Sequence, residues 1–366
     1  MVAAHQFRSD FATYLQPRSC LHTKKQETRL IFSNSRRPSP LSSKMAEFLP
    51  LQSIVGGLFI GAACGAYMFF AARIAGNSGA LSALLLGPRE PTKLTFLCGL
   101  LGGGAMMGSC LPSAFEVMPF TPIKLAVAGL SVGLGTALGN GCTSGHGLCG
   151  LSRLSLRSLV AVPTFMVVAG ATATVDAGAA VGPPLSIGTT PQAVLALAAK
   201  LAAALLAALV PVTLMGGPKN LQLRELYVGL WSGVCFAVGL AIGGMVRPSV
   251  VAGALSPARF DGTLWALFMT ALAATFVLYR LAEASGTTAA KASPTATVDT
   301  PLIAGSALFG LGWGLAGVCP GPHIVCLGAN PTASAPLLML AFVAIGMLLS
   351  EPLRGALMSA QSSRSR

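Results

Sequence analysis

The chain has 366 residues, of which 53% are hydrophobic and only 10% are charged. A soluble domain carries about 25% charged residues to keep its surface hydrated, so this composition excludes a soluble globular protein. The formal net charge of +13 would suit a nucleic-acid binder. The basic residues, however, lie in short loops or within the first 45 positions and form no single patch. Nucleic acid is therefore excluded as a partner, and the lipid bilayer is the predicted solvent of most of the chain.

Residues 1–45 differ in composition from the rest of the chain. They hold eight basic residues and only two acids, Asp10 and Glu27, and they contain many Ser and Thr. An apolar core of 7–15 residues, which a secretory signal peptide needs, is missing. The segment is typical of an organellar transit peptide, and a disordered tail or an extension upstream of a start at Met45 explains it equally well. The membrane in which the protein resides, plasma or organellar, is thus left open.

From Ser53 onward, apolar runs alternate with Pro, Gly and charged residues. A helix needs about 20 apolar residues to cross a bilayer. On that criterion we predict an all-α, multi-pass integral membrane protein with nine spans, near 53–72, 93–111, 123–139, 157–176, 192–216, 226–245, 261–281, 301–318 and 334–352. Two shorter apolar stretches, 74–87 and 248–258, are predicted to be re-entrant.

The chain contains an internal repeat. GLFIGAACGAYMFFAARIAGNSGAL from Gly57 aligns with GLWSGVCFAVGLAIGGMVRPSVVAGAL from Gly229, and GTALGNGCTSGHGLCGLS aligns with GWGLAGVCPGPHIVCLGA. The predicted units are a first repeat at 46–185, a linking helix at 186–220, a second repeat at 221–353 and a short C-terminal tail at 354–366. Five crossings separate equivalent points, so the repeats are inverted, an arrangement common in transporters.

Loop charges agree with this topology. One side of the membrane holds the N-terminal end of the first span. After Ser53, the loops on that side carry only Lys124, Arg247 and Arg259. All other basic residues of the predicted membrane region outside the spans lie on the opposite side. The positive-inside rule makes that opposite side cytoplasmic or its equivalent.

Two glycine- and cysteine-rich segments, 139–150 and 317–328, follow apolar helices directly. We expect non-helical backbone there, which at membrane depth must be buried in protein or line a polar cavity. The candidate pathway residues in and near these segments are Gly141, Thr143, Ser144, Gly145, Pro320, Gly321 and Pro322, with Asn77 and Ser78 at the first re-entrant segment. Unpaired N–H groups at helix N-termini beside such breaks favour an anion.

Cys142 and Cys319 occupy equivalent places in the two segments, so the inverted repeat brings them toward one midplane region. A polarisable thiol suits a soft sulfur atom, whereas a hard oxyanion alone calls for Arg, Lys and N–H groups. Packing is the ordinary role of a buried cysteine, but the symmetric placement favours function. For Cys149, seven residues beyond Cys142, a gate and simple packing are equally good explanations.

Each cysteine is followed four residues later by a histidine, His146 or His323. The favoured role for both is a hydrogen bond that satisfies a helix break. We predict no metal, because one thiol and one imidazole per segment lack the paired spacing of a zinc site. Arg73 and Arg247 lie at the starts of the re-entrant segments, where anchoring to the interface is the favoured role and attracting an anion is the alternative.

Three motifs resemble the YeeE/YedE family of sulfur-compound transporters: GCTSGHGLCGLSRLSLRSLVAV at 141–162, ARIAGNSG at 72–79 and GWGLAGVCPGP at 312–322. The likeness runs from about Gly57 to about Pro352. It implies nine spans, helical loops that narrow to a central constriction, and import of thiosulfate by S–H contacts with loop cysteines, here Cys142 and Cys319. The family's R-x-C-F-N-S is altered, since Ala75 replaces a relay cysteine. Cys64 is not the positional equivalent of that cysteine, so the substrate is less certain than the fold.

The leading hypothesis is therefore a permease, not an enzyme, for thiosulfate or a related small sulfur-containing anion, without a catalytic residue or cofactor. The chain shows no ATP-binding P-loop, so transport would be passive or ion-coupled. A second hypothesis is a membrane sulfurtransferase, in which Cys142 or Cys319 becomes a persulfide and hands sulfur to a soluble sulfurtransferase. A structural membrane scaffold is the third.

Overall fold

The computed structural model describes residues 50–116, 120–176, 190–215, 220–257, 260–287, 289 and 297–364. The predicted N-terminal segment 1–45 lies outside them. Every regular element in these ranges is a helix, which confirms the predicted all-α class. The long helices are α3 (Pro50–Ala71), α5 (Pro91–Cys110), α6 (Pro122–Gly139), α7 (Leu156–Asp176), α8 (Pro191–Leu214), α9 (Leu221–Ile242), α11 (Thr263–Ala284), α12 (Thr300–Ala316) and α14 (Ser334–Leu348).

Eight helical segments within these ranges are long and apolar enough to cross a membrane, so the chain is a multi-pass integral membrane protein. They correspond to eight of the nine predicted spans. The ninth, α5, is a 20-residue helix at the expected place, but its glycines and polar residues lower its hydropathy and it is not among the eight. Its crossing of the membrane stays a prediction.

Six shorter elements complete the described chain: α4 (Asn77–Leu85), η1 (Pro112–Ala114), η2 (Thr143–Gly150), α10 (Pro248–Leu255), α13 (Pro320–Ala329) and α15 (Ser350–Arg364). Helices α4 and α10 occupy the two predicted re-entrant stretches. Helix α15 begins at Ser350 and includes most of the stretch predicted as a C-terminal tail.

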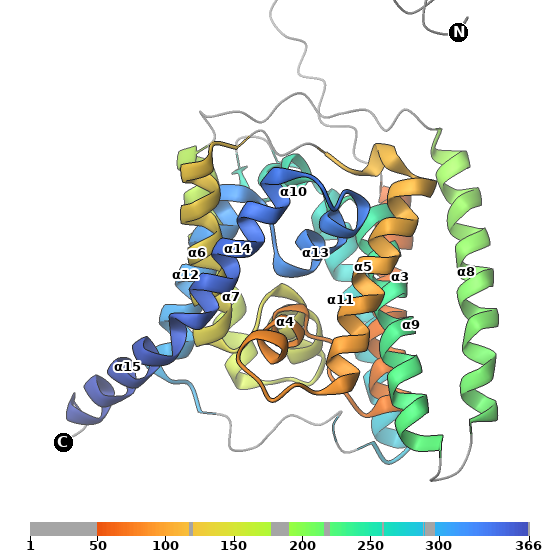
Figure 1. Ribbon diagram of the computed structural model, residues 1–366, viewed down its shortest axis with the longest axis horizontal. Coiled ribbons are helices and arrows are strands. Elements are labelled where there is room, and N and C mark those ends of the chain that lie inside the picture. The colour runs from red at the N-terminus through yellow and green to blue at the C-terminus, as the bar shows by residue number, and fades with distance from the viewer. Residues whose placement is uncertain are drawn as a thin grey trace, which may run out of the picture. The chain divides into compact units, whose positions relative to one another are not determined.

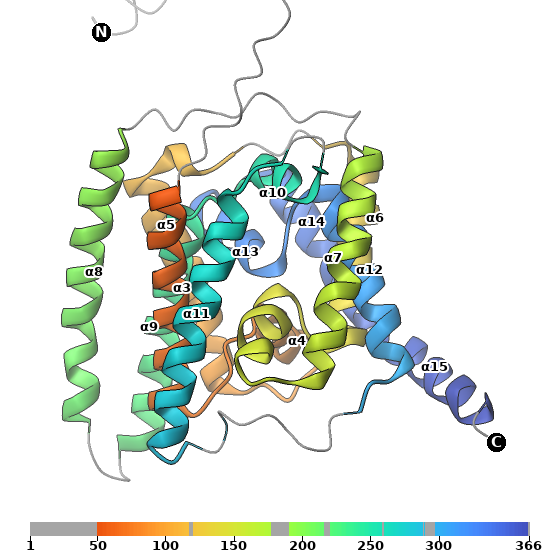
Figure 2. The same ribbon diagram turned by 180° about the vertical axis from the view of Figure 1, so that it is seen from behind.

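The long helices form two groups of four, and each group takes two helices from each repeat. Helices α3, α5, α9 and α11 pack together in one group, and α6, α7, α12 and α14 in the other. The contacts are symmetric, since α5 packs on α9 as α11 packs on α3, and α12 packs on α7 as α6 packs on α14. Figures 1 and 2 show the groups on either side of the short helices, with α8 at the outer edge.

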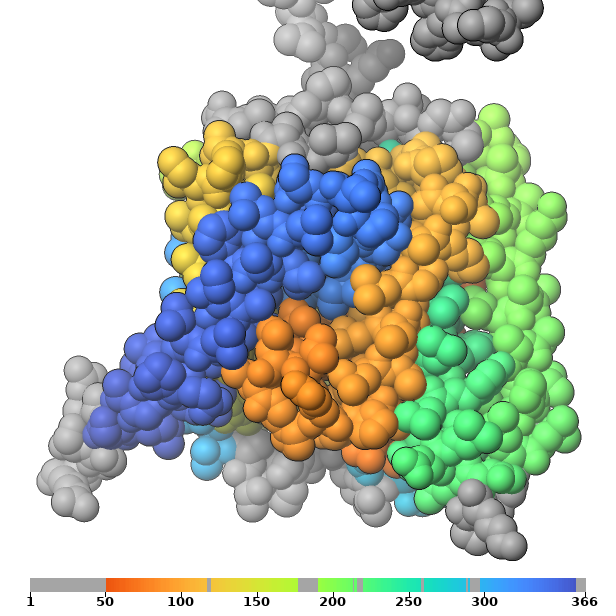
Figure 3. All heavy atoms as spheres, in the orientation of Figure 1, coloured from red at the N-terminus to blue at the C-terminus, as the bar shows by residue number. Residues whose placement is uncertain are grey.

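Equivalent helices run in opposite directions. In Figure 2, α3 descends from the upper edge, whereas α9 starts at the lower edge, where it follows α8. Figure 3 shows one lateral face of the molecule, on which α4 and the segment around α13 and α14 meet at the centre between the two groups.

The expectation of non-helical backbone across 139–150 and 317–328 is wrong for most of both segments. Residues 143–150 form the π-helix η2 and residues 320–329 form α13. Intrahelical hydrogen bonds satisfy peptide groups that lipid cannot, which is the physical reason for helix here. Only three residues separate each short helix from the long helix before it, and Asn140 and Gly317 make the turns in the left-handed region, with φ of 56° and 62°.

Close helix contact depends on glycine where α5 crosses α9. A Cβ on Gly99 would lie 2.2 Å from the carbonyl oxygen of Leu230, and one on Gly233 would lie 2.2 Å from that of Phe96. Small residues at such crossings let two backbones approach, which is a main source of helix association in lipid.

We expect Gly99→Val to destabilise the protein by about 1–3 kcal/mol, because the added atoms force the α5 and α9 backbones apart. Gly102→Val on the same helix is the control, since a Cβ there meets no atom within 4 Å. Thermal unfolding of the detergent-solubilised protein measures both. Equal melting temperatures for the two variants would contradict the tight crossing.

Candidate functional site

The two candidate cysteines come together at the centre of the fold. Cys142 is the N-cap residue of η2 and Cys319 is the N-cap residue of α13. Both are buried, with exposed fractions of 0% and 1%, and their thiols are near neighbours. Thr143 Oγ1 lies 3.1 Å from Cys319 Sγ, so the two repeats meet at a thiol–hydroxyl contact. We call this contact, together with the Cys142 thiol, the constriction.

Helix α4 supplies the third wall of this constriction. Its first two residues, Asn77 and Ser78, are buried. The Asn77 N–H donates to Ser144 Oγ at 3.2 Å, and Ser144 Oγ lies 3.3 Å from Cys142 Sγ. Ser78 lies close to Cys142, and its buried hydroxyl makes no hydrogen bond within the described residues. The N-termini of α4, η2 and α13 therefore converge on the two thiols, and together they direct partial positive charge to one place.

Gly321 is needed for this convergence. A Cβ at Gly321 would lie 2.0 Å from Asn77 Nδ2, so α13 approaches α4 only because position 321 has no side chain. The predicted pathway residues of η2, α13 and α4 are thus brought together by the structure.

The two histidines hold backbone at the helix breaks. His146 Nε2 lies 3.0 Å from the Gly139 carbonyl oxygen, and its Nδ1 lies 3.0 Å from Ser158 Oγ. His323 Nε2 lies 2.6 Å from the Pro336 carbonyl oxygen. A carbonyl only accepts, so Nε2 carries the proton in both rings. Among the described residues, no three His, Cys, Asp or Glu side chains form a group that could hold a metal ion.

Cys149 does not lie at the constriction but beside Ala75. Its Sγ donates to the Ala75 carbonyl oxygen at 3.0 Å and lies 3.9 Å from Cys64 Sγ. Both thiols are fully buried. Cys64 on α3 and Ala75 are not equivalent in sequence, yet both lie next to the Cys149 thiol. Only the tertiary fold reveals this thiol pair.

A charged hollow of about 440 Å³ adjoins the constriction at the edge where α4 begins. Its lining reaches Ser78, Gly141, Gly145 and His146. We call it the vestibule; its charged lining residues are Arg73, Glu90, Lys93, Arg153 and Arg157. Four cations against one carboxylate make it attractive to anions.

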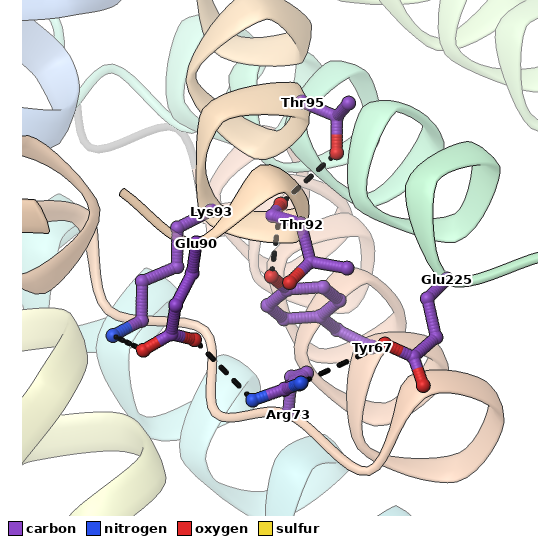
Figure 4. A network of polar contacts seen from close by, with 7 residues as sticks. All are labelled: Tyr67, Arg73, Glu90, Thr92, Lys93, Thr95 and Glu225. Atoms are coloured by element: carbon purple, nitrogen blue, oxygen red, sulfur yellow. Dashed lines mark hydrogen bonds and ion pairs between the residues drawn. The ribbon is translucent and has the colours of Figure 1, made fainter. Parts of the chain in front are cut away.

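Figure 4 shows the part of the vestibule around Arg73. Arg73 Nη1 lies 3.3 Å from Glu90 Oε2, and Nη2 lies 3.7 Å from Glu225 Oε2. Lys93 Nζ lies 2.9 Å from Glu90 Oε1. The sequence analysis did not select Glu90, Lys93 or Glu225. The i,i+3 spacing of Glu90 and Lys93 is typical of an ion pair on a helix. Nothing in the sequence indicates that this pair lies opposite Arg73.

Arg73 and Arg247 are equivalent in sequence but differ in environment. The Arg73 side chain is 44% exposed and borders the vestibule. Arg247 is only 7% exposed, and it donates to the carbonyl oxygens of Ser113 and Ala114 at 2.7 and 3.3 Å. The geometry therefore favours a pathway role for Arg73 and a packing role for Arg247.

On the lateral face between α7 and α11, a second hollow of about 80 Å³ reaches the constriction. Asn77, Thr143, Ser144 and Pro322 form its inner end, and apolar side chains including Phe165 and Phe268 form the rest. Nothing in this lining compensates an ionic charge, so the charged vestibule is the better route for an anion.

The chain was compared with known proteins. Residues 224–361 match a family of unknown function, DUF6691. A "Probable transporter" of Xylella fastidiosa strain Temecula1 is 38% identical over 126 residues, which make up 33% of this chain and 90% of that protein. A "Probable transporter" of strain 9a5c is 37% identical over 126 residues, with the same coverage. Another from strain Temecula1 is 32% identical over 130 residues, 34% of this chain and 86% of that protein. No solved structure matches the chain significantly.

We expect Gly321→Ala to disrupt the constriction, because the added methyl group displaces Asn77 from its contact with Ser144. Gly145→Ala in η2 is the matched control, since a Cβ there meets no atom within 4 Å. Overpacking of this size costs about 1–3 kcal/mol. Labelling of Cys142 and Cys319 with a small thiol reagent should accelerate in Gly321→Ala and stay slow in the control. Equally slow labelling of both variants would contradict the tight contact.

Proposed function

Because this chain belongs to the family of these bacterial probable transporters and is a membrane transporter, we propose that it carries thiosulfate or a related sulfur-containing anion. The observation that supports the proposal best is the contact between the two repeats at Cys142, Thr143 and Cys319. Motif resemblance to the YeeE/YedE transporters supports the same substrate class.

The chemistry of the constriction suits a weakly held sulfur anion. Three helix N-termini supply partial positive charge, and the wall residues Asn77, Ser78, Thr143 and Ser144 supply neutral polar groups. No Lys or Arg touches the two thiols through a described hydrogen bond, so a dianion would not be trapped there by full opposite charge. A site that conducts must bind weakly enough to release its ligand.

The thiols add selectivity for sulfur. An S–H group is a weak donor and a polarisable partner, so it suits the outer sulfur of thiosulfate better than the hard oxygens of sulfate. Passage between the repeats requires Thr143 and Cys319 to separate. A sulfur anion that bridges Cys319 and Cys142 would replace the thiol–hydroxyl contact as that separation occurs. In this proposal the anion passes between neighbouring thiols without a large rocking motion.

Cys149 lies beside the segment that precedes α4. The family cysteine that Ala75 replaces would have put a thiol on the segment before α4. Here the Cys149 thiol contacts the Ala75 backbone from η2. We propose that Cys149 supplies the third soft contact, with Cys64 packed behind it.

Uptake of ³⁵S-labelled thiosulfate into proteoliposomes tests the proposal. We expect Cys142→Ala and Cys319→Ala to reduce uptake roughly ten- to hundredfold, the size expected for loss of a hydrogen bond to a charged ligand. Cys98→Ala is the control, because Cys98 is an exposed thiol on α5.

Wild-type uptake by the Cys142→Ala, Cys319→Ala double variant would refute the thiol pathway. Persulfide on either cysteine, with release of sulfite and without net uptake, would instead support the membrane sulfurtransferase. In that reaction the thiolate attacks the outer sulfur, the S–S bond of thiosulfate breaks, and a soluble thiol acceptor takes the sulfur from the persulfide.

A further inference from the structure

The vestibule contains a carboxylate in the position that an anionic ligand would be expected to take. Glu90 uses one oxygen for Lys93, at 2.9 Å, and the other for Arg73, at 3.3 Å. Figure 4 shows the carboxylate between these two cations. An oxyanion with two oxygens has the same geometry, because it can also bridge an ammonium and a guanidinium group.

Buried contacts hold the backbone that carries this carboxylate. The buried Tyr67 donates from its hydroxyl to the Thr92 carbonyl oxygen at 3.1 Å, and its ring stacks on Phe96 with centroids 5.5 Å apart. Thr95 Oγ1 donates to the same carbonyl at 3.0 Å. These contacts hold the first turn of α5, from which both Glu90 and Lys93 project.

The charged side chains themselves are less constrained. Arg73, Glu90 and Lys93 are 44%, 30% and 33% exposed. Glu90 is the N-cap residue of α5, but its side chain accepts no capping hydrogen bond from the helix. The carboxylate can therefore turn toward solvent without a loss of helix hydrogen bonds.

We propose that Arg73 and Lys93 form an anion-binding site that the Glu90 carboxylate occupies when no ligand is present. An incoming oxyanion competes with Glu90 for these two cations. A dianion such as thiosulfate interacts more strongly with the pair than the single charge of a carboxylate does. Glu90 thus sets how strongly the vestibule binds anions, and it makes binding weak enough for passage onward to Ser78 and Gly141.

The identity of the transported anion in this inference rests on the proposed function, but the competition itself does not. Sulfate is a suitable probe, because it has the oxygens that Arg73 and Lys93 would bind and lacks the soft outer sulfur that the thiols would select. Sulfate binding therefore reports on the vestibule alone.

Equilibrium binding of ³⁵S-sulfate and ³⁵S-thiosulfate to the purified full chain in detergent at low salt tests the proposal. We expect Glu90→Gln to tighten binding of both anions about three- to tenfold, the effect of removing one competing charge at a partly exposed site. Arg73→Gln should weaken binding of both. Glu225→Gln is the matched control, because the ion pair of Glu225 with Arg73 is long, at 3.7 Å, and among the described residues Glu225 forms no ion pair with Lys93; it should change binding less than about twofold.

Glu90→Asp offers a second measurement should Glu90→Gln fold poorly, since the shorter side chain keeps the charge but reaches both cations less well. It should tighten binding by a smaller factor. Unchanged or weaker binding in Glu90→Gln, or the same change in Glu225→Gln, would overturn the proposal. Tighter sulfate binding by Glu90→Gln without any wild-type thiosulfate uptake would refute the transported substrate and leave the vestibule site intact. Cysteine-dependent thiosulfate uptake, together with unchanged anion affinity in Glu90→Gln, would refute the vestibule site and leave the transported substrate intact.

Discussion

The central arrangement depends on satisfying the peptide groups where α6 ends inside the protein. A helix end leaves carbonyl groups without intrahelical partners, and lipid offers none. His146 binds the Gly139 carbonyl, and Arg354 from α15 binds those of Ala137 and Leu138 at 2.7 and 3.0 Å. The chain can then turn at Asn140 and begin η2 with Cys142 at its N-terminus. The candidate site therefore depends on one imidazole from inside the break and one guanidinium from the far end of the chain.

The exchange of helices between the repeats places the constriction at their interface. Because α3 and α5 pack with α9 and α11, neither repeat forms a bundle by itself. Cys142 belongs to one repeat and Cys319 to the other, so a single repeat holds only half of the site. The aligned stretches of the Xylella relatives, 126 to 132 residues, are about as long as one repeat, from Pro50 to Asp176 or from Leu221 to Leu348. Each repeat is thus about as long as the stretch that this chain shares with one of these relatives.

Features that depend on local pattern were predictable from the sequence. Apolar runs predict the long helices, and the paired motifs predict that Cys142 and Cys319 lie close together. The residue pattern alone did not predict the short helices η2 and α13, although the family resemblance implied helical loops, because glycine-rich runs show no helical periodicity and their helicity is imposed by burial. The pairing of Cys149 with Cys64, and that of Glu90 with Arg73, join distant segments through α3, α5 and η2. A single sequence has no local signal for such contacts. For the same reason, the sequence does not indicate that the environments of Arg73 and Arg247 differ.

The difference between those two arginines bears on how the site is used. At one end Arg73 is exposed in a charged vestibule. At the other end Arg247 is buried on carbonyl oxygens, and the N-terminus of α10 is occupied by Glu116, whose Oε2 accepts from the Ser249 N–H at 3.1 Å. An inverted repeat would offer an anion the same charge at both ends, and this chain has neutralised one of them. In the proposed function, charge acts at the vestibule and thiol chemistry at the midpoint. Attraction and selection would then be separated in space, and neither step would have to hold the anion tightly.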